Sequence, residues 1–563
     1  MHHHLSLRAK LIIMGSVMAS MFLVALDQTI VSTALGRIVE QFNAFESLSW
    51  IVTAYLLTTT VTVPIAGKLS DLFGRRKLLL IGVAIFALGS LFSGMAGDIN
   101  QLIIARAVQG IGGGIITANA FTIIGDLFAA RERGKWQGLI GAVFGMSSVV
   151  GPLLGGWLTQ GAVIGGLTTD WRWTFYINVP IAIVAFILIA VFCPSLKHDK
   201  KPRIDYRGAT LLTIALSTLI LAVDNTESIF SGLMDATGIS LVLLRGIMFS
   251  IVVLATAGFI YVERKADEPI LPLHFFKNRN FVLIMGIAAL FGSAFMGAIL
   301  YLTQFNQQVY GASPTMSGLM LLPMVAGLMG TSITSGQIIS RTGKYKIFMQ
   351  VGIVISTVMI ALLTTMHPDT PYWHEGLIMF FLGAGLGVVM PVMNLAVQSE
   401  FKQHDIGVAT SSSQLFRGLG TTIGVAVFGA VLTAGLSSHI GDMSQNAYVQ
   451  SLKQSPIGST ILKDTTDTNT LLNLNMHDTK QRMTESFSQA TSQLPPAAKE
   501  KAQEKFNTEQ KQYNDVIVNA FSESLRGIFI TSAVLMAIAA VLVFSLKERV
   551  LGKASPNEAP GVE

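Results

Sequence analysis

The sequence contains fourteen runs of about 20 mostly apolar residues, the length that an α-helix needs to cross the hydrocarbon core of a bilayer. Only 13% of the 563 residues are charged, about half the share of a soluble chain. The pattern predicts an all-α polytopic membrane protein with 14 transmembrane helices and excludes a soluble enzyme, a disordered chain and a fibrous repeat. The runs lie near 11–35, 48–68, 77–96, 101–126, 135–158, 174–194, 207–225, 238–262, 281–303, 315–340, 346–366, 376–397, 408–433 and 522–546.

Basic residues gather in alternate loops between these runs. They begin with Arg8 and Lys10, recur at 75–77 and 131–135, and continue to 547–549. Cytoplasmic loops of membrane proteins carry such an excess of Lys and Arg. We therefore expect both termini in the cytoplasm, and we assign the net charge of +6 to these loops rather than to a nucleic-acid partner.

Two loops in the chain resemble each other. Residues 67–77 join the second and third runs, and residues 336–346 join the tenth and eleventh. Each occupies the same place in a group of six runs, which predicts two pseudo-symmetric six-helix halves (6+2+6), a build found in many secondary transporters. The predicted parts are a cytoplasmic N-terminus (1–10), a first half (11–196), a linker with two additional helices (197–280), a second half (281–546) and a cytoplasmic tail (547–563).

One polar segment, residues 434–521, separates the last two runs. Its position predicts a long extracytoplasmic loop. Because its end, from Pro496 onward, has helical composition and long unstructured loops are uncommon, we expect a helical hairpin over the outer mouth. The alternative is an uninvolved insertion.

Three ionisable residues lie deep inside predicted spans: Asp27, Arg106 and Arg417. Placing a charged group in hydrocarbon costs free energy, so we take an ionisable residue inside a span to have a function. Asp27 and Arg106 both fall in the outer half of their spans, and a nearby Arg that moves would change the proton affinity of a carboxylate. We expect a proton-coupling pair; the alternatives are a fixed ion pair, or an Arg106 that only binds backbone carbonyls. Arg417 is a candidate inner gate, with Glu400 and Asp405 as its nearest acids.

The loop at 67–77 resembles the signature G-x-L-x-D-x-x-G-R of the major facilitator superfamily, through Gly67, Asp71, Gly74 and Arg75. Asp71 can pair with Arg75 or cap a neighbouring helix N-terminus. With Asp126 as a third member, we expect a cytoplasmic latch that forms in one state and breaks in the other. The alternative is a static charged turn.

Further segments are similar to motifs of the fourteen-span drug:proton antiporter family, the QacA/EmrB-like group. An antiporter motif of the form G-P-x-x-G-G lies in the fifth run, with Ser147 where a Gly is usual. The alternative to its functional role is a kinked, close-packed helix. The matching segments are 26–31, 106–110, 171–180 and 407–410, together with the antiporter-motif residues Gly138, Gly151, Pro152, Gly155 and Gly156.

Polar and aromatic residues near the middle of the spans are candidates for a substrate pocket, although most such residues make ordinary helix–helix contacts. An apolar pocket with one acid and few polar groups suits lipophilic cations or neutral amphiphiles. The absence of an acid from 316–340 favours monovalent or neutral substrates. The pocket candidates are Tyr55, Asn119, Gln304, Asn306, Asn394 and Gln414.

The resemblance implies a proton-coupled antiporter that exports lipophilic drugs, biocides or other amphiphiles by alternating access from a bacterial cytoplasmic membrane. We expect a monomer in the lipid bilayer without cofactor or metal. The alternative is an exporter of a lipid, glycolipid or other endogenous amphiphile on the same fold. The single cysteine, the ten unpaired histidines and the lack of a GxxxxGK[ST] loop argue against an enzyme or an ATP-driven pump.

Overall fold

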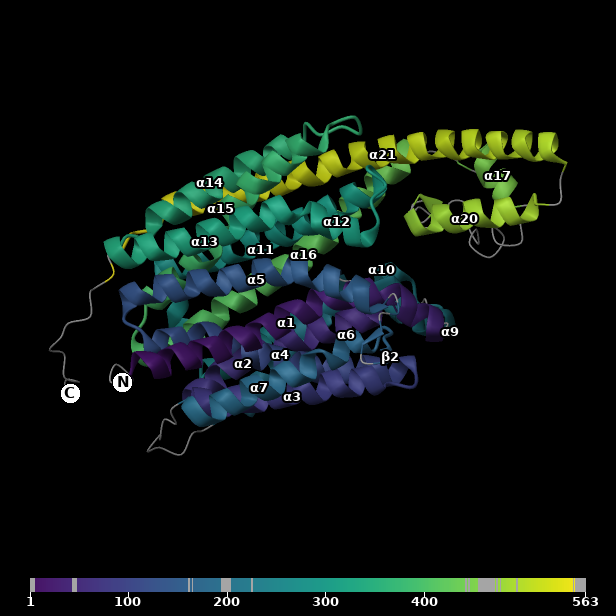
Figure 1. Ribbon diagram of the computed structural model, residues 1–563. Helices are drawn as coiled ribbons and strands as arrows, with labels where there is room; N and C mark the ends of the chain where they lie inside the picture. The colour runs from purple at the N-terminus through teal and green to yellow at the C-terminus, as the bar shows by residue number, and fades with distance from the viewer. Residues whose placement is uncertain are drawn as a thin grey trace, which may run out of the picture.

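The structure is a computed structural model of the chain. Fourteen helices of the part that it describes are long and apolar enough to cross a membrane, the number predicted from the apolar runs. They lie side by side in one elongated bundle (Figure 1). The described residues are 6–42, 48–159, 161, 163–164, 166–193, 204–223, 226–440, 443, 446–453, 471, 474–475, 477–492, 495–549 and 551.

The first half of the bundle contains six of these helices. A short antiparallel hairpin of β1 (Val163–Ile164) and β2 (Leu167–Thr168) lies between the fifth and sixth. The helices are α1 (Leu7–Phe42), α2 (Leu48–Phe73), α3 (Arg75–Met95), α4 (Ile99–Leu127), α5 (Ala130–Thr159) and the pair α6 (Trp173–Tyr176) and α7 (Asn178–Phe192).

The linker and the second half follow in the predicted order. The linker contains α8 (Tyr206–Val223), α9 (Thr226–Thr237), α10 (Leu241–Glu263) and the 3-10 helix η2 (Leu273–Lys277). A second 3-10 helix, η3 (Gln403–Asp405), precedes α16. The second half contains α11 (Arg279–Gln308), α12 (Pro314–Met320), α13 (Leu322–Thr342), α14 (Lys346–Leu363), α15 (Tyr372–Ser399), α16 (Ile406–Ile440) and α21 (Pro496–Phe544).

The tenth apolar run forms two helices, α12 and α13, instead of one. Ser313 caps the start of α12, because its hydroxyl accepts a hydrogen bond from Met316 N at 3.3 Å. Pro323 lies in the first turn of α13, where its missing N–H leaves no bond unmade. The same missing N–H prevents the hydrogen-bond ladder of α12 from continuing without a break.

The two ends of the bundle differ. α1 begins and α21 ends at the same end, which we call the terminal end (Figure 1). The opposite end carries the outer arm, formed by α17 (Ala447–Lys453), α20 (His477–Ala490) and residues 496–521 of α21. The predicted cytoplasmic loops at 67–77 and 336–346 both lie at the terminal end.

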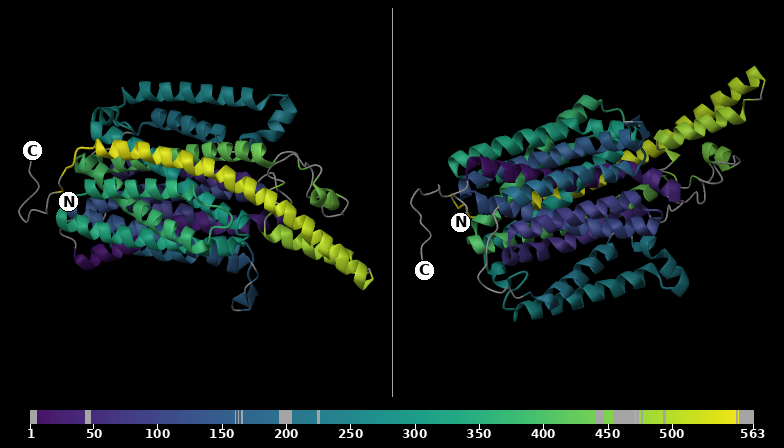
Figure 2. Two further views of the ribbon diagram at one scale, coloured as in Figure 1. Left: turned by 90° about the horizontal axis from the view of Figure 1, so that it is seen from above. Right: turned by 60° about the horizontal axis from the view of Figure 1, so that its bottom comes forward.

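The outer arm is held together by aromatic packing. The rings of Phe487 and Phe506 stack with their centroids 4.2 Å apart, and Tyr448 packs on Tyr513 at 5.3 Å. Because α21 runs 49 residues without a break, the described part of the arm extends well beyond the bundle (Figures 1 and 2). This differs from the expected position over the outer mouth. Residues 454–470 of the segment lie outside the described residues.

The two linker helices α8 and α10 lie on one side of the bundle (Figure 2). α8 packs between α10 and α2, and α10 exposes apolar side chains such as Val242 and Leu254, as a lipid-facing helix does. An apolar cavity of about 370 Å³ lies between these helices, η2 and α16. Its lining includes Leu212, Leu216, Phe259, Phe276, Leu415 and Leu419.

Candidate functional site

Asp27 of α1 and Arg106 of α4 meet in the interior of the first half. Arg106 Nη1 lies 2.5 Å from Asp27 Oδ2. Asp27 is 0% exposed and Arg106 is 2% exposed, so water reaches neither charge in this conformation. The two residues therefore lie level with each other, as their opposite chain directions led us to expect.

Two amides complete the surroundings of Asp27. Gln109 Nε2 donates to Asp27 Oδ1 at 2.8 Å, and Asn178 Nδ2 donates to the same oxygen at 3.1 Å. Gln109 Oε1 accepts from Arg106 Nη1 at 2.7 Å, and Asn178 also donates to Ser90 Oγ at 3.1 Å. An ionised carboxylate only accepts hydrogen bonds, and here donors from two helices fill both oxygens. One buried network thus joins α1, α3, α4 and α7.

Tyr55, a predicted pocket residue, covers the other side of Arg106. The guanidinium carbon lies 4.2 Å from the centre of the Tyr55 ring, a distance at which the ring face attracts a cation. Arg106 Nε also donates to the carbonyl of Ile51 at 3.4 Å. The expected roles of Arg106 as an ion-pair partner and as a tie to backbone are both present.

The antiporter motif packs against the turn that follows Asp27. A Cβ added to Gly151 of α5 would overlap Thr29 Oγ1, so only glycine permits this approach of α5 to α1. Thr29 Oγ1 donates to the carbonyl of Ser147 at 3.0 Å. Ser147, which departs from the motif, directs its own hydroxyl to the Phe144 carbonyl at 2.7 Å. The motif therefore contacts α1 at Thr29, two residues beyond Asp27.

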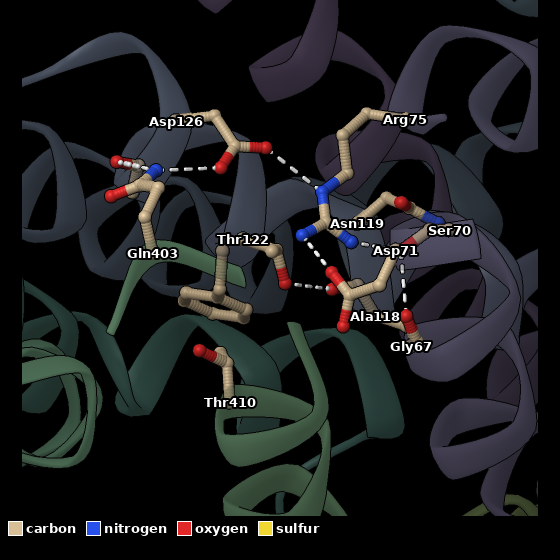
Figure 3. Close-up of polar contacts among 12 residues, drawn as sticks. Gly67, Ser70, Asp71, Arg75, Ala118, Asn119, Thr122, Asp126, Gln403 and Thr410 are labelled. Atoms are coloured by element: carbon tan, nitrogen blue, oxygen red, sulfur yellow. Dashed lines mark hydrogen bonds and ion pairs between the residues drawn. The ribbon is translucent and has the colours of Figure 1, made fainter. Parts of the chain in front are cut away.

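The predicted latch residues meet at the terminal end (Figure 3). Arg75 lies between two carboxylates: Arg75 Nε donates to Asp126 Oδ2 at 2.9 Å, and Arg75 Nη2 pairs with Asp71 Oδ1. Gly74 has a φ of 94°, a conformation that glycine adopts without strain in the turn between α2 and α3. Gly67 allows α16 to approach, because a Cβ there would overlap Ser411 Oγ.

Each latch carboxylate also bonds to the second half. Asp71 Oδ2 accepts a hydrogen bond from Val408 N at 3.1 Å, in the first turn of α16, where a helix favours negative charge. Asp126 Oδ1 accepts from Gln403 Nε2 at 2.8 Å. Both roles considered for Asp71, pairing with Arg75 and capping a helix, thus occur at once. The latch holds the two halves together in this conformation.

The second-half loop makes a corresponding contact without an acid. Arg131, at the start of α5, donates to the carbonyl of Leu551 at 2.8 Å and to that of Arg341 at 3.4 Å. Leu551 N in turn donates to the carbonyl of Gly343 at 3.0 Å. This connection uses backbone carbonyls where the first loop uses Asp71, and Ser340 stands at the corresponding position of the second loop.

A glycine-lined seam joins α5 to the second half. Ser332 of α13 donates to the carbonyl of Gly138 at 2.8 Å, and a Cβ at Gly138 would overlap the Ser332 carbonyl oxygen. Pro152 packs on Gly318 of α12, where an added Cβ would lie 2.9 Å from its ring. The last motif glycines, 155 and 156, are buried. α5 therefore contacts α1 with one face and α13 with another.

The six pocket candidates do not gather in one place. Tyr55 lies at Arg106, and Asn119 lies near the latch, with its Nδ2 donating to the Ile115 carbonyl at 2.8 Å (Figure 3). Gln414 Nε2 donates to Asn394 Oδ1 at 2.9 Å, inside the second half. The remaining two candidates, Gln304 and Asn306, lie near the end of α11 that is closer to the outer arm.

Arg417 does not pair with Glu400, one of the two acids nearest to it in the sequence. Glu400 lies at the terminal end, where Arg549 approaches it at 3.3 Å and Asn280 Nδ2 donates to it at 2.7 Å. Asp405 is separated from Arg417 by about 18 Å of helix axis. The hydrogen bonds of Arg417 instead lie within the second half, to Gln414 and Met390.

The sequence analysis missed another fully buried carboxyl, that of Glu375 in the first turn of α15. It is 0% exposed, and Asn306, with its amide oriented to donate, lies 2.9 and 3.1 Å from its two oxygens. Burial and the nearby Glu375 carboxyl raise the pKa of Tyr310. Glu375 was overlooked because it precedes the apolar run at 376–397. Gln109 and Asn178 lay inside matched motifs, but neutral amides carry no distinct sequence signal.

The fold and these buried polar networks define a membrane transporter built from two related halves. The family model of the Major Facilitator Superfamily matches residues 17–425, and the chain belongs to this superfamily. It acts on small molecules in a membrane and is not an enzyme.

The multidrug transporter protein MdtP of Bacillus subtilis (strain 168) is 36% identical over 541 residues, which cover 95% of this chain and 93% of that protein. Multidrug resistance protein 3 of the same organism is 36% identical over 434 residues, which cover 77% and 81%. Among solved structures, the proton:xylose symporter XylE aligns with a TM-score of 0.56 at 16% identity over 76% of this chain and 90% of its own. The last likeness concerns the fold alone.

We predict that Asp71→Asn slows transport without weakening substrate affinity, because it removes a charge from the latch and leaves the spans unchanged. Loss of the ion pair and of the charge at the α16 N-terminus costs about 1–2 kcal/mol, a factor of about 5–30 in the balance of the two conformations. Initial transport rates at varied substrate concentration measure the effect. Asp98→Asn, which alters a helix cap within one half, is the control. An unchanged maximal rate for Asp71→Asn would contradict the latch.

We also predict that Gly138→Ala lowers both the melting temperature and the transport rate. The new methyl group would overlap the Ser332 carbonyl, and overpacking of this kind costs about 1–3 kcal/mol. Gly330→Ala is the matched control, because nothing lies within 4 Å of a Cβ at that position. Equal melting temperatures and transport rates of the two variants would contradict the prediction, because they would show that α5 and α13 can move apart at Gly138 without cost.

Proposed function

We propose that this protein exports lipophilic drugs, biocides or other amphiphiles in exchange for protons, with Asp27 as the proton-binding group. The observation that carries the proposal is the carboxylate of Asp27, fully buried in a transmembrane helix and paired with Arg106. Two relatives bear multidrug names and are 36% identical to the chain, which supports drugs as the substrate class. Protons as the coupling ion follow from the chemistry of a buried carboxyl.

The terminal end is the cytoplasmic side in this proposal, and the membrane is a bacterial cytoplasmic membrane. The clustering of Lys and Arg at this end supports the orientation. Because the latch and the Gly138–Ser332 contact of the seam join the halves toward this end, the conformation described above is closed toward the cytoplasm. The outer arm then lies outside the cell.

The proposed cycle begins when a proton reaches Asp27. A neutral Asp27 no longer balances the charge of Arg106, so the network of Gln109 and Asn178 rearranges. The adjacent turn of α1 at Thr29 contacts Gly151 of α5, and α5 carries this movement to the seam with α13. Opening of the seam and the latch exposes the path to the cytoplasm, where substrate enters as the proton leaves.

The driving force for this exchange is adequate. A membrane potential contributes about 2.3 kcal/mol per elementary charge for each 100 mV, and a pH gradient adds to it. One proton moving inward therefore raises an amphiphile's outward gradient by more than tenfold.

An exporter of a lipid, glycolipid or other endogenous amphiphile is the second candidate. The apolar cavity between α8, α10 and α16 favours it, because its lining consists of side chains suited to hydrocarbon. A panel of dyes and biocides against lipids, assayed in liposomes under an imposed proton gradient, separates the two candidates.

We predict that Asp27→Asn abolishes proton-driven export while the protein stays folded in the membrane. The amide keeps the size of the side chain but cannot bind and release a proton in this pH range. Substrate efflux from liposomes under an inward-directed proton gradient measures the effect. Asp170→Asn is the matched control, because it breaks a partly exposed ion pair with Arg172 in the same half. Full gradient-dependent export by Asp27→Asn would remove the proposal.

A further inference from the structure

Arg417 lies inside the second half with several of its hydrogen-bond donors unused. It follows the start of α16 by eleven residues, about 16 Å along the helix, near the middle of a hydrocarbon core about 30 Å thick. Nη2 donates to Gln414 Oε1 at 2.6 Å, while Nη1 has only the Met390 sulfur at 3.9 Å. Nε is buried and has no partner among the described residues.

Arg133 shows how a purely structural arginine looks in the same chain. Arg133 is buried, whereas Arg417 is half-buried, and like Arg417 it makes no ion pair with any described carboxylate. Its Nε donates to the Phe128 carbonyl at 3.0 Å, and its Nη2 donates to the Gly125 carbonyl at 2.9 Å and to Gln403 Oε1 at 3.2 Å. Arg417 makes no comparable set of bonds to backbone carbonyls in the described part of the chain, so a structural tie does not account for it.

A second unused donor belongs to the same cluster. Asn394 Oδ1 accepts from Gln414 Nε2 at 2.9 Å, but Asn394 Nδ2 is buried without a partner among the described residues. Gln414 therefore links two side chains that each present an unsatisfied N–H. Buried donors are normally satisfied, and this pair requires an acceptor that the described chain does not provide.

Gln414 lies on the side of α16 that packs against α2 of the first half. Ser411, three residues before Gln414, approaches Gly67 of α2. A Cβ at Gly418, four residues after Gln414, would lie 3.6 Å from Thr60 Cγ2 of α2. Substrate sites of transporters built from repeats lie at this interface, near the bilayer midplane.

The charge of Arg417 is also unbalanced. In the first half, Asp27 neutralises Arg106, whereas no described carboxylate forms an ion pair with Arg417. A charge that is half-buried within a membrane span and has no counter-charge is costly, and a cationic substrate at this position would increase the cost. An anionic substrate would remove it.

We propose that Arg417 and Asn394 bind the head group of the exported amphiphile, and that this group is anionic: a carboxylate, sulfonate or phosphate. The proposal rests on the function proposed above, and it narrows the expected cationic or neutral substrates to anionic ones. A guanidinium binds such groups through paired N–H donors. The anion can belong to a drug or to the head group of an anionic phospholipid.

The test uses three probes that share one aromatic body and differ only in the head group: pyrenebutyrate, pyrenebutanol and pyrenebutyl-trimethylammonium. Binding to the purified full-length protein is measured without a proton gradient. We expect pyrenebutyrate to bind the wild type most tightly, and Arg417→Gln to weaken its binding by about tenfold to a hundredfold, with little change for pyrenebutanol. Arg245→Gln, in linker helix α10, is the control for loss of a partly buried arginine.

A second variant protects the test against misfolding. Gln414→Glu is nearly isosteric and places a carboxylate against Arg417 Nη2, so it should abolish the preference for pyrenebutyrate while Arg417 stays in place. Equal binding of the three probes by the wild type, or an unchanged preference in both variants, would overturn the proposal.

Competition identifies the source of the anion. Displacement of pyrenebutyrate by short-chain phosphatidylglycerol, but not by phosphatidylcholine, supports a lipid head group, and displacement by neither supports a drug. Failure of the anion site can be distinguished from failure of the proposed proton-driven export. A head-group preference without proton-driven export contradicts only proton coupling, whereas proton-driven export without a preference contradicts only the anion site.

Discussion

Burial of the Asp27–Arg106 ion pair is the constraint on which the first half of this protein depends. Two charges removed from water are stable only when their geometry is good and their remaining hydrogen-bonding positions are filled. Gln109, Asn178 and the Tyr55 ring meet this requirement here. Helices α1, α4 and α7 must therefore converge on one carboxylate, and any change in its protonation disturbs all three. Protonation of Asp27 would therefore alter the packing of several helices of the first half.

Helix α5 connects the helix that carries Asp27 to the second half. Its glycines allow backbone contact with α1 on one face and with α13 on the other, so movement at Asp27 and movement between the halves share one helix. The latch adds a second connection, in which Arg75 balances Asp71 and Asp126 while both carboxylates hold donors from the second half. Packed interfaces of this kind change between discrete arrangements rather than deforming gradually, which suits alternating access.

The sequence was sufficient for the fold, because a helix in hydrocarbon must satisfy its own backbone and so needs a long apolar run. The rarity of charges in such runs also singled out Asp27 and Arg106, and the loop signature singled out the residues of the predicted latch. Contacts that a neutral residue makes with a distant one, such as that of Gln403 with Asp126, have no sequence signal. The acid Glu400, near Arg417 in the sequence, does not contact it, because nearness in the chain says little about contact across a helix bundle. Glu375 escaped notice because it lies just outside an apolar run.

The central claim is that substrate and proton compete through Asp27. Proton release on substrate binding tests it most directly, with purified protein in weak buffer and a pH indicator between about pH 5 and 8. Linkage between the two ligands requires that substrate binding displace up to about one proton per protein from the wild type. We expect this release to vanish in Asp27→Asn and to persist in Asp170→Asn. Equal release by the wild type and Asp27→Asn, or no release by the wild type at any pH, would contradict the account.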